Sequence, residues 1–223
     1  RRALAAAGLD PEEIELIVFG SCSFDDQVPN QASGLQIRLG ARRAAAMDVN
    51  TACTSFLYSL STASALIRNG AVRNAVVIGG ERISAFMDWQ DRGVSVLFGD
   101  GCAAVVLEAT DKKEALLAER LGCDVDARQT LVVEGMGARY ADLDRFLGLS
   151  RWIFEGQEIF KRSVIGMTGA CIDVLETANY GPEDVGLVVP HQANLRIIEA
   201  VAKRAGVPME RVFVNVHRYG NMS

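Results

Sequence analysis

The sequence predicts an α/β fold with a largely parallel sheet and helices on its faces. Short apolar segments rich in β-branched residues recur along the chain, and segments with apolar residues at helical spacing separate them. The composition is that of a globular protein, with 49% hydrophobic and 23% charged residues among 223. A chain of this length is able to form a sizeable core.

The predicted strands are short apolar runs, at 14–21, 44–50, 73–81, 101–110, 185–190 and 211–216. The predicted helices lie at 30–41, after Cys53, at 156–181 and at 193–205. We expect the strand at 101–110 to pair antiparallel and Gly181 to end the long helix. The order strand, helix, strand, helix occurs twice, which is a coarse internal symmetry.

This order divides the chain into three parts. The first half is 1–110 and the second half is 156–223. Between them, 111–155 mixes charged and apolar residues, and we interpret it as an irregular connection or lid.

Composition and charge exclude several classes of protein. The net charge is −5, and no run of Lys and Arg exceeds two, so no nucleic-acid partner is predicted. No apolar run reaches the roughly 18 residues that a membrane helix needs, and the opening segment resembles the end of a helix rather than a signal peptide. The five cysteines lack metal-ligand or disulfide-framework spacing, which predicts a reduced, cytoplasmic protein without a metal site.

Cys53 lies where a predicted strand turns into a helix. Backbone N–H groups of the first helical turn point at such a residue, and the helix dipole adds positive potential. Both effects favour a thiolate, so the position is suited to a nucleophile. The alternative is that Cys53 is a small buried hydrophobic residue.

Two further residues are candidates for the same site. His191 lies at the carboxyl end of a predicted strand, the edge of an α/β sheet where ligands bind. Asn221 follows Gly220, which lets the backbone bend so that the amide could present N–H donors inward. The other histidine, His217, is expected on a solvated loop. Since Cys53, His191 and Asn221 all follow predicted strand ends, we predict that they form one site.

The segments "NTACTSF", "DRGVSVLFGDGCAAVVLEA", "VVPHQANLRIIEAVAKRAGV" and "RYGNMS" resemble the β-ketoacyl-acyl-carrier-protein synthase III family, which has the thiolase fold. The resemblance implies two duplicated α/β halves in a layered αβαβα arrangement, a homodimer, and a site between the halves. It also implies that parts of the fold at both ends, before Arg1 and after Ser223, lie outside this chain.

The resemblance also implies a reaction. Acyl-coenzyme A would acylate Cys53, and decarboxylative Claisen condensation with malonyl-acyl-carrier protein (malonyl-ACP) would give a 3-oxoacyl-ACP, the first step of fatty-acid synthesis. His191 and Asn221 would donate hydrogen bonds to the enolate oxygen that forms when CO₂ leaves. The partners would be acyl-coenzyme A and the acyl carrier protein, with no cofactor and no metal.

Five binding residues carry over from the family. Arg92 would meet the nucleotide end of coenzyme A, Gly156 and Asn194 would contact the pantetheine arm, and Arg196 would help to seat the acidic carrier protein. Val28 stands where the family often has a bulky Phe that closes the partner's acyl pocket, which predicts medium or longer acyl chains. Another departure follows the nucleophile, where Thr-Ser replaces the frequent Ala-Gly and adds hydroxyls that could cap the helix.

Other functions stay open. A sister thiolase-fold enzyme could use a non-ACP acceptor, as in polyketide, alkylquinolone or long-chain ketone synthesis. A hydroxymethylglutaryl-type product would need a carboxylate base, for which Glu81 is the nearest candidate. A papain-like protease also runs Cys, His, Asn, but the sequence lacks its "CGSCW"-type signature. A non-catalytic homologue would have no use for Cys53, His191 and Asn221 together.

Overall fold

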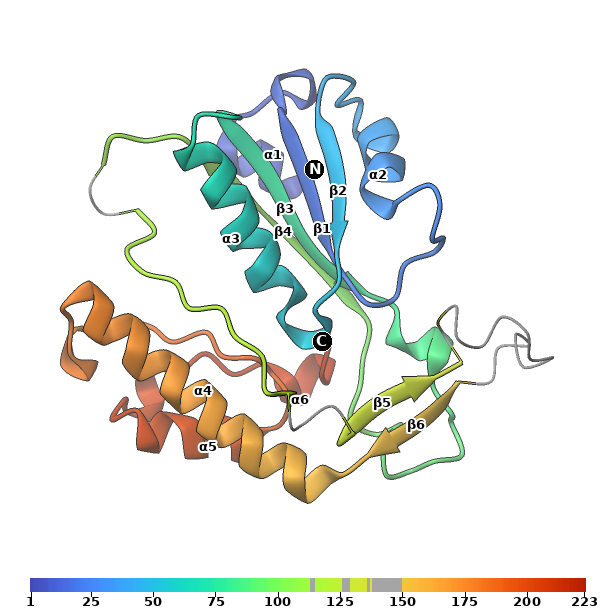
Figure 1. Cartoon of the computed structure of the whole chain (residues 1–223), viewed down its shortest axis with the longest axis vertical. Helices are drawn as coiled ribbons and strands as arrows, with labels where there is room; N and C mark the ends of the chain where they lie inside the picture. The colour runs from blue at the N-terminus through green and yellow to red at the C-terminus, as the bar shows by residue number, and fades with distance from the viewer. Residues whose placement is uncertain (113–114, 126–128, 136, 138–149) are drawn as a thin grey trace. The chain divides into compact units, whose positions relative to one another are not determined.

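The computed structural model describes residues 1–223 except 113–114, 126–128, 136 and 138–149. Two compact units can be distinguished. The first consists of 1–82, 101–117 and 223, and the second of 83–100 and 118–222. The helices and strands of the described part (Figure 1) are α1 (Arg2–Ala7), η1 (Pro11–Glu13), β1 (Leu16–Gly20), α2 (Gln31–Leu39), β2 (Ala45–Val49), η2 (Ala52–Thr54), α3 (Ser55–Arg68), β3 (Asn74–Glu81), η3 (Ile83–Phe86), β4 (Gly101–Glu108), β5 (Leu131–Glu134), β6 (Arg151–Phe154), α4 (Gly156–Ala178), η6 (Pro182–Asp184), α5 (Leu195–Arg204), η7 (Met209–Arg211) and α6 (Val216–Tyr219).

The first unit is a four-stranded sheet in the order β2-β1-β3-β4. The strands β2, β1 and β3 are parallel, and β4 is antiparallel to β3, as predicted for 101–110. Successive residues of β1 point to opposite faces of the sheet, because side chains alternate along a strand. Ile17 and Phe19 enter one apolar cluster, and Leu16 and Val18 enter the other.

Helices cover both faces of this sheet (Figure 1). Leu4 of α1 and Ala32 of α2 pack in the cluster with Ile17, whereas Ala63 of α3 packs in the cluster with Val18. The predicted α/β layering is therefore confirmed in the first unit.

Asp48, near the end of β2, fixes the start of α2. Its carboxylate accepts hydrogen bonds from the backbone N–H groups of Gln31 at 2.7 Å and Ala32 at 2.8 Å. A negative charge at a helix N-terminus is favourable, because these N–H groups have no partner within the helix. The side chain of Asn30 caps the same helix through the Ser33 N–H.

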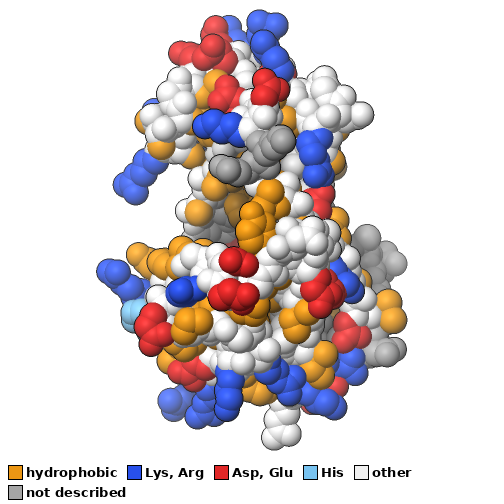
Figure 2. All heavy atoms as spheres, turned by 90° about the vertical axis from the view of Figure 1, so that its left-hand side faces the viewer, with side chains coloured by type: hydrophobic (Ala, Val, Ile, Leu, Met, Phe, Trp, Pro, Cys, Tyr) orange, Lys and Arg blue, Asp and Glu red, His pale blue; other side chains and the backbone are white. Residues whose placement is uncertain are grey.

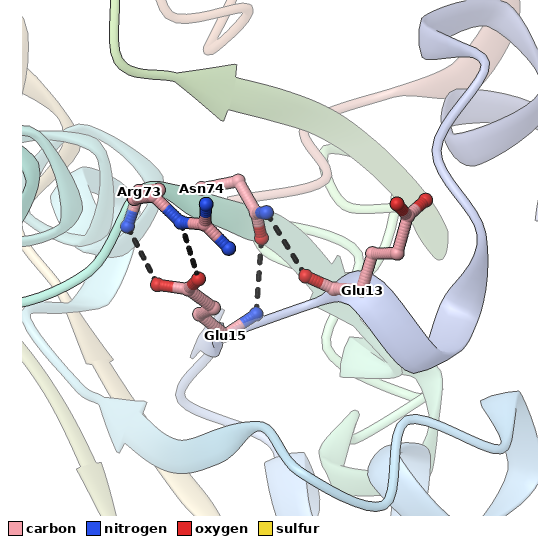
Figure 3. Close-up of polar contacts among 4 residues, drawn as sticks. All are labelled: Glu13, Glu15, Arg73 and Asn74. Atoms are coloured by element: carbon pink, nitrogen blue, oxygen red, sulfur yellow. Dashed lines mark hydrogen bonds and ion pairs between the residues drawn. The ribbon is translucent and has the colours of Figure 1, made fainter.

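The amino ends of β1 and β3 are joined by side chains (Figure 3). The Asn74 amide donates to the Glu13 carbonyl at 2.9 Å and accepts from the Glu15 N–H at 3.0 Å. Next to it, the Glu15 carboxylate accepts from the backbone N–H of Arg73 at 2.7 Å and from its Nε at 2.9 Å. Asn74 is buried, so its side chain supplies hydrogen bonds that water cannot.

The second unit is organised around α4 and α5, whose buried residues Val164, Ile197 and Val201 form its apolar cluster. The predicted helix at 156–181 is confirmed as α4, but it ends at Asn179 in the left-handed conformation (φ 59°) rather than at Gly181. An asparagine tolerates this conformation better than most residues, so it serves as the stop.

The same unit holds an apolar cavity of about 210 Å³. It lies among α4, α5 and the extended segments near them, and its lining includes Cys171, Leu175, Leu187, Pro190, Ile198 and Val212. Neither His191 nor Asn221 lines this cavity.

Two predicted strands of the second half are wrong. Within the described part of the chain, 185–190 and 211–216 pair only through one parallel bridge, between Val188 and Val212. The apolar run predicted a buried strand, but Leu187 and Val189 of this run are 60% and 69% exposed. A strand needs a hydrogen-bonded partner along its whole length, and these two segments share only two backbone hydrogen bonds, both made by Val188.

The segment expected as an irregular connection also contains regular structure. β5 and β6 form an antiparallel pair. Phe98 packs on Trp152 of β6, with ring centroids 4.9 Å apart. Most of the residues between β5 and β6 lie outside the described part.

The surface carries charges of both signs. Figure 2 shows Lys and Arg side chains interspersed with Asp and Glu side chains on the face that it draws. Among the helices of the described residues, none is both long enough and apolar enough to cross a membrane.

Candidate active site

Cys53 lies in a tight turn at the carboxyl edge of the first unit's sheet. It belongs to the short 3₁₀ helix η2, between the end of β2 and the start of α3. The preceding residue, Ala52, has φ +50°, a left-handed conformation that is uncommon for a residue with a Cβ. A strained residue beside a nucleophile is typical of a sharp strand-to-helix turn.

Hydroxyl groups hold this turn in place. Ser55 Oγ accepts from the Thr51 N–H at 2.9 Å and donates to the Ala52 carbonyl at 2.7 Å. Thr54 Oγ1 donates to the Thr51 carbonyl at 2.8 Å. The hydroxyls predicted to cap α3 therefore do not cap it: Thr54 is the N-cap residue and makes no side-chain cap bond. They brace the backbone on both sides of Cys53 instead.

A carboxylate lies at the same edge of the sheet. Glu81, the last residue of β3, accepts hydrogen bonds from the Ser21 hydroxyl at 3.0 Å and the Cys22 N–H at 2.9 Å. It also accepts from the Ser23 hydroxyl, and the Cys22 thiol lies 3.6 Å from it. These donors come from the loop after β1, so Glu81 anchors that loop.

Burial raises the pKa of the Cys53 thiol, and the negative charge of Glu81 acts in the same direction. A hydrogen bond with Ser223 acts in the opposite direction and is outweighed. Burial, and after it the charge of Glu81, raise the pKa of Cys22 to about 12. The expectation that this position favours the thiolate is therefore not met: burial and the charge of Glu81 outweigh the Ser223 and backbone hydrogen bonds, and the pKa of the Cys53 thiol lies above its ordinary value.

His191 lies in the second unit, in the loop that follows the Val188 bridge. The prediction that His191 lies at the end of a strand is therefore wrong, because the segment before it is not a regular strand. The side chain is partly buried, and burial lowers its pKa. The imidazole is thus neutral at pH 7, with one N–H donor and one acceptor nitrogen. His217 is exposed, but it lies in α6 rather than in a loop.

Asn221 is held by a backbone bridge rather than by a strand. Its N–H donates to the Leu97 carbonyl, and its carbonyl accepts from the Gly99 N–H, both at 2.9 Å. These bonds form a parallel bridge with Phe98. Asn221 is 7% exposed, so its backbone is fixed in a buried position.

Two glycines permit this arrangement. Gly220 has φ +69° and ψ −166°, a conformation essentially restricted to glycine. At Gly99, a Cβ would collide with the Tyr219 carbonyl oxygen. The backbone of the residues around Asn221 therefore approaches 97–99 more closely than a side chain would allow.

The predicted binding residues are distributed over both units. Val28 is 87% exposed in the first unit, in the loop between β1 and α2. The others lie in the second unit: Arg92 is exposed in a turn, Gly156 begins α4, and Arg196 is exposed in the first turn of α5. Asn194 is the N-cap of α5, where its Oδ1 accepts from the Ile197 N–H at 3.0 Å.

The cap role of Asn194 limits what it can do for a ligand. Its side-chain oxygen is engaged in the helix cap, so a contact with a pantetheine arm would fall to Nδ2.

Two residues that the structure places in this region, Gln192 and Glu81, were not predicted to have the contacts that they make. Gln192 stands directly after His191 in "PHQAN", and Glu81 ends a predicted strand. Apart from the bond of Gln192 to Pro190, the hydrogen-bond partners of Gln192 lie 21 to 24 residues away along the chain, and those of Glu81 lie 58 to 60 residues away. Within the described residues, no group of three or more His, Cys, Asp or Glu is arranged to hold a metal ion.

Two family models match the chain. The model "3-Oxoacyl-[acyl-carrier-protein (ACP)] synthase III" matches residues 47–125, and its C-terminal counterpart matches 175–223. The first includes Cys53, and the second includes His191 and Asn221.

Relatives and solved structures agree with the models. The chain is 45% identical over its whole length to β-ketoacyl-[acyl-carrier-protein] synthase III 2 of Vibrio cholerae and covers 62% of that protein. It is 44% identical to β-ketoacyl-[acyl-carrier-protein] synthase III of Roseiflexus castenholzii, covering 100% of this chain and 68% of that one. The crystal structure of 3-oxoacyl-[acyl-carrier-protein] synthase III from Aquifex aeolicus superposes with a TM-score of 0.90 at 39% identity, covering 99% of this chain and 68% of that one.

Proposed function

Since the chain belongs to the 3-oxoacyl-[acyl-carrier-protein] synthase III family, we propose that it carries out the acyl transfer and condensation that initiate fatty-acid synthesis. The chain spans 62% of the length of the Vibrio cholerae relative. The activity, the substrates and the partners are proposed for the whole protein. Its substrates are an acyl-coenzyme A and malonyl-ACP, and its product is a 3-oxoacyl-ACP.

The first step is acyl transfer to Cys53. The sulfur attacks the thioester carbonyl, the bond to the sulfur of coenzyme A breaks, and the proton of the Cys53 thiol leaves with coenzyme A. The observation that carries this step is the position of Cys53 in a braced strand-to-helix turn, after the left-handed Ala52. The backbone N–H of Cys53 is one donor for the oxyanion that forms.

The second step is decarboxylation of the malonyl thioester. Loss of CO₂ leaves an enolate, whose oxygen accepts hydrogen bonds from His191 and from the Asn221 amide. A neutral imidazole suits this role, and the lowered pKa of His191 supports it. Each such donor contributes about 3 kcal/mol to the stabilisation of a developing oxyanion.

In the third step, the enolate carbon attacks the acyl carbonyl on Cys53. A carbon–carbon bond forms, the bond to the Cys53 sulfur breaks, and the sulfur leaves as a thiolate that takes up a proton from solvent water. Glu81 is not assigned a role as a base, because its oxygens are engaged by donors of the loop after β1.

Binding and assembly extend the proposal. Arg92, Gly156 and Asn194 contact coenzyme A, and Arg196 contacts the acidic carrier protein. The protein acts as a homodimer in the cytoplasm, in which Val28 borders the acyl pocket of the partner. Its 87% exposure supports a contact outside this chain, and the free cysteines support a reducing compartment.

Intact-mass spectrometry of the full-length protein with a series of acyl-coenzyme A thioesters tests this function. We expect a mass gain that is lost in Cys53→Ala, is retained in the control Cys22→Ala, and disappears when malonyl-ACP is added. If the acyl group stays on Cys53 when malonyl-ACP is added but is removed when malonyl-coenzyme A is added, the protein is a sister enzyme that uses a non-ACP acceptor. If no thioester labels Cys53, a non-catalytic homologue is favoured.

A further inference from the structure

The side chain of Gln192 makes four hydrogen bonds to backbone groups of the second unit. Its Nε2 donates to the carbonyls of Pro190 at 3.0 Å and Phe213 at 3.1 Å. Its Oε1 accepts from the N–H groups of Asn215 at 2.8 Å and Val216 at 3.1 Å.

This set uses the full hydrogen-bonding capacity of the side chain. A glutamine amide has two N–H donors and an oxygen with two lone pairs. All four positions of Gln192 are engaged inside the unit, and the side chain is partly buried. Gln192 is therefore built into the fold and has no group left for a ligand.

The bonded segments carry the two predicted donors of the decarboxylation step. Pro190 directly precedes His191 in the chain. Asn215 and Val216 lead into α6, and α6 leads through Gly220 to Asn221. Gln192 thus connects the loop of His191 to the start of the short helix that ends at Asn221.

Other bonds complete this connection. The bridge between Val188 and Val212 joins the same two segments three to four residues earlier in each. At the far end of α6, Asn221 is fixed by the bridge to Phe98. Asn215 is the N-cap of α6 but makes no side-chain cap bond, so the Gln192 oxygen supplies the cap.

From these contacts we propose that Gln192 is a positioning residue that fixes the segments bearing His191 and Asn221 relative to each other. The role rests on the proposed function, in which these two residues act on one enolate oxygen. Two donors act together only if both lie within hydrogen-bonding distance of that oxygen, so their spacing is decisive.

The variant Gln192→Met tests this role, because methionine has a similar length and volume but replaces none of the four hydrogen bonds. The matched control is Gln157→Met, at an exposed glutamine in α4. Two half-reactions are followed separately in the full-length protein: acylation of Cys53 by acyl-coenzyme A, read by intact mass, and CO₂ release from malonyl-ACP.

We expect Gln192→Met to slow CO₂ release by about 10- to 100-fold, since a misplacement of about 1 Å can cost a factor of that size. Acylation of Cys53 should stay within about twofold of the wild type, because none of the groups that hold the Cys53 turn changes. The Gln157→Met control should match the wild type in both half-reactions. Equal losses in both half-reactions, or no loss of CO₂ release, would overturn the positioning role.

A second measurement does not depend on catalysis. Amide hydrogen exchange at Asn215 and Val216 should be faster in Gln192→Met, and the His191 imidazole resonances should move. Unchanged exchange at these two amides would also overturn the proposal. If the wild type neither acylates nor releases CO₂ but the exchange changes as expected, the proposed function fails while the structural connection stands.

Discussion

The carboxylate of Glu81 accepts a hydrogen bond from the backbone N–H of Cys22 at 2.9 Å, and the Cys22 thiol lies 3.6 Å from the same carboxylate. A negative charge at the end of β3 is thus placed against one thiol and close enough to a second, Cys53, to act on its pKa. Both thiols are held in the protonated form by burial and by this charge.

We expect Glu81→Gln to lower the pKa of Cys22 from its value of about 12 and to lower that of Cys53 as well. The substitution removes the charge and keeps an oxygen that can accept the Cys22 N–H. The rate of alkylation by iodoacetamide as a function of pH, read for each thiol by peptide mass spectrometry, measures this. Glu108→Gln, at an exposed position in β4, is the control. Coincident profiles for Glu81→Gln and the wild type would contradict the prediction.

Asn74→Ala should lower the free energy of unfolding by about 1–3 kcal/mol, because it leaves the Glu13 carbonyl and the Glu15 N–H without their partner. Urea denaturation followed by circular dichroism measures the change. The control is Asn69→Ala, at an exposed residue after α3, for which we expect a change within about 0.5 kcal/mol. Equal values for the two variants would show that the Asn74 bonds do not contribute.

The stability of the fold should decrease below about pH 6.5, in part because of His191. Its pKa is lower in the folded state than in the unfolded state, so the unfolded state binds more protons between the two values. The contribution is fully present above the unfolded pKa and is lost as the pH falls toward the folded pKa.

The free energy of unfolding between pH 5 and 8 measures this contribution. The slope should be smaller in His191→Gln than in the wild type, whereas His217→Gln should keep it. A slope that is unchanged in His191→Gln would show that another group causes the pH dependence.

Gly99→Ala should disrupt the bridge that holds Asn221, because the added Cβ would meet the Tyr219 carbonyl oxygen. We expect lower stability and faster hydrogen exchange at the Asn221 amide. The matched control is Gly166→Ala in α4, where a Cβ meets nothing within 4 Å. That variant should be more stable by about 0.5–1 kcal/mol, since glycine is unfavourable inside a helix. Retained protection of the Asn221 amide in Gly99→Ala would refute the close-approach argument.

Val28→Phe should shift the acyl preference of the full-length enzyme toward shorter chains, because a larger side chain would reduce the acyl pocket of the partner. The kcat/KM values for a series of acyl-coenzyme A thioesters measure this. Arg38→Lys, at an exposed residue of α2, is the control and should keep the wild-type preference. A strict preference of the wild type for acetyl-coenzyme A would refute the premise that Val28 widens the pocket.

Local patterns predicted the elements of the first unit. The strand β1 was predicted from a short, continuous apolar run, which is typical of a strand buried on both faces, and Ile17 and Val18 do enter apolar clusters on opposite faces. The turn at Cys53 was also predicted from local sequence, because an apolar run precedes it and a segment with apolar residues at helical spacing follows it. The segment 185–190 has an equally apolar pattern, but a strand also needs a partner, and no local pattern specifies one.

The electrostatics of the site were less predictable. The pKa of Cys53 depends on burial and on Glu81, and these are properties of the folded chain. Glu81 reaches Ser21 across 60 residues of sequence, and Gln192 reaches Val216 across 24. Such contacts depend on tertiary packing, so the helix dipole alone gave the wrong direction for the pKa of Cys53.

The central strand pair of the first unit, β1 and β3, has side-chain bonds at both of its ends: Asn74 joins β3 to Glu13, the last residue of η1, and Glu81 joins β3 to the loop after β1. A register shift of one residue between β1 and β3 would break both sets of bonds together. It would also turn Phe19 to the opposite face of the sheet. Misaligned pairings of β1 and β3 therefore lose stabilising bonds at two distant points during folding. The correctly aligned sheet places Cys53 at one defined position at its carboxyl edge.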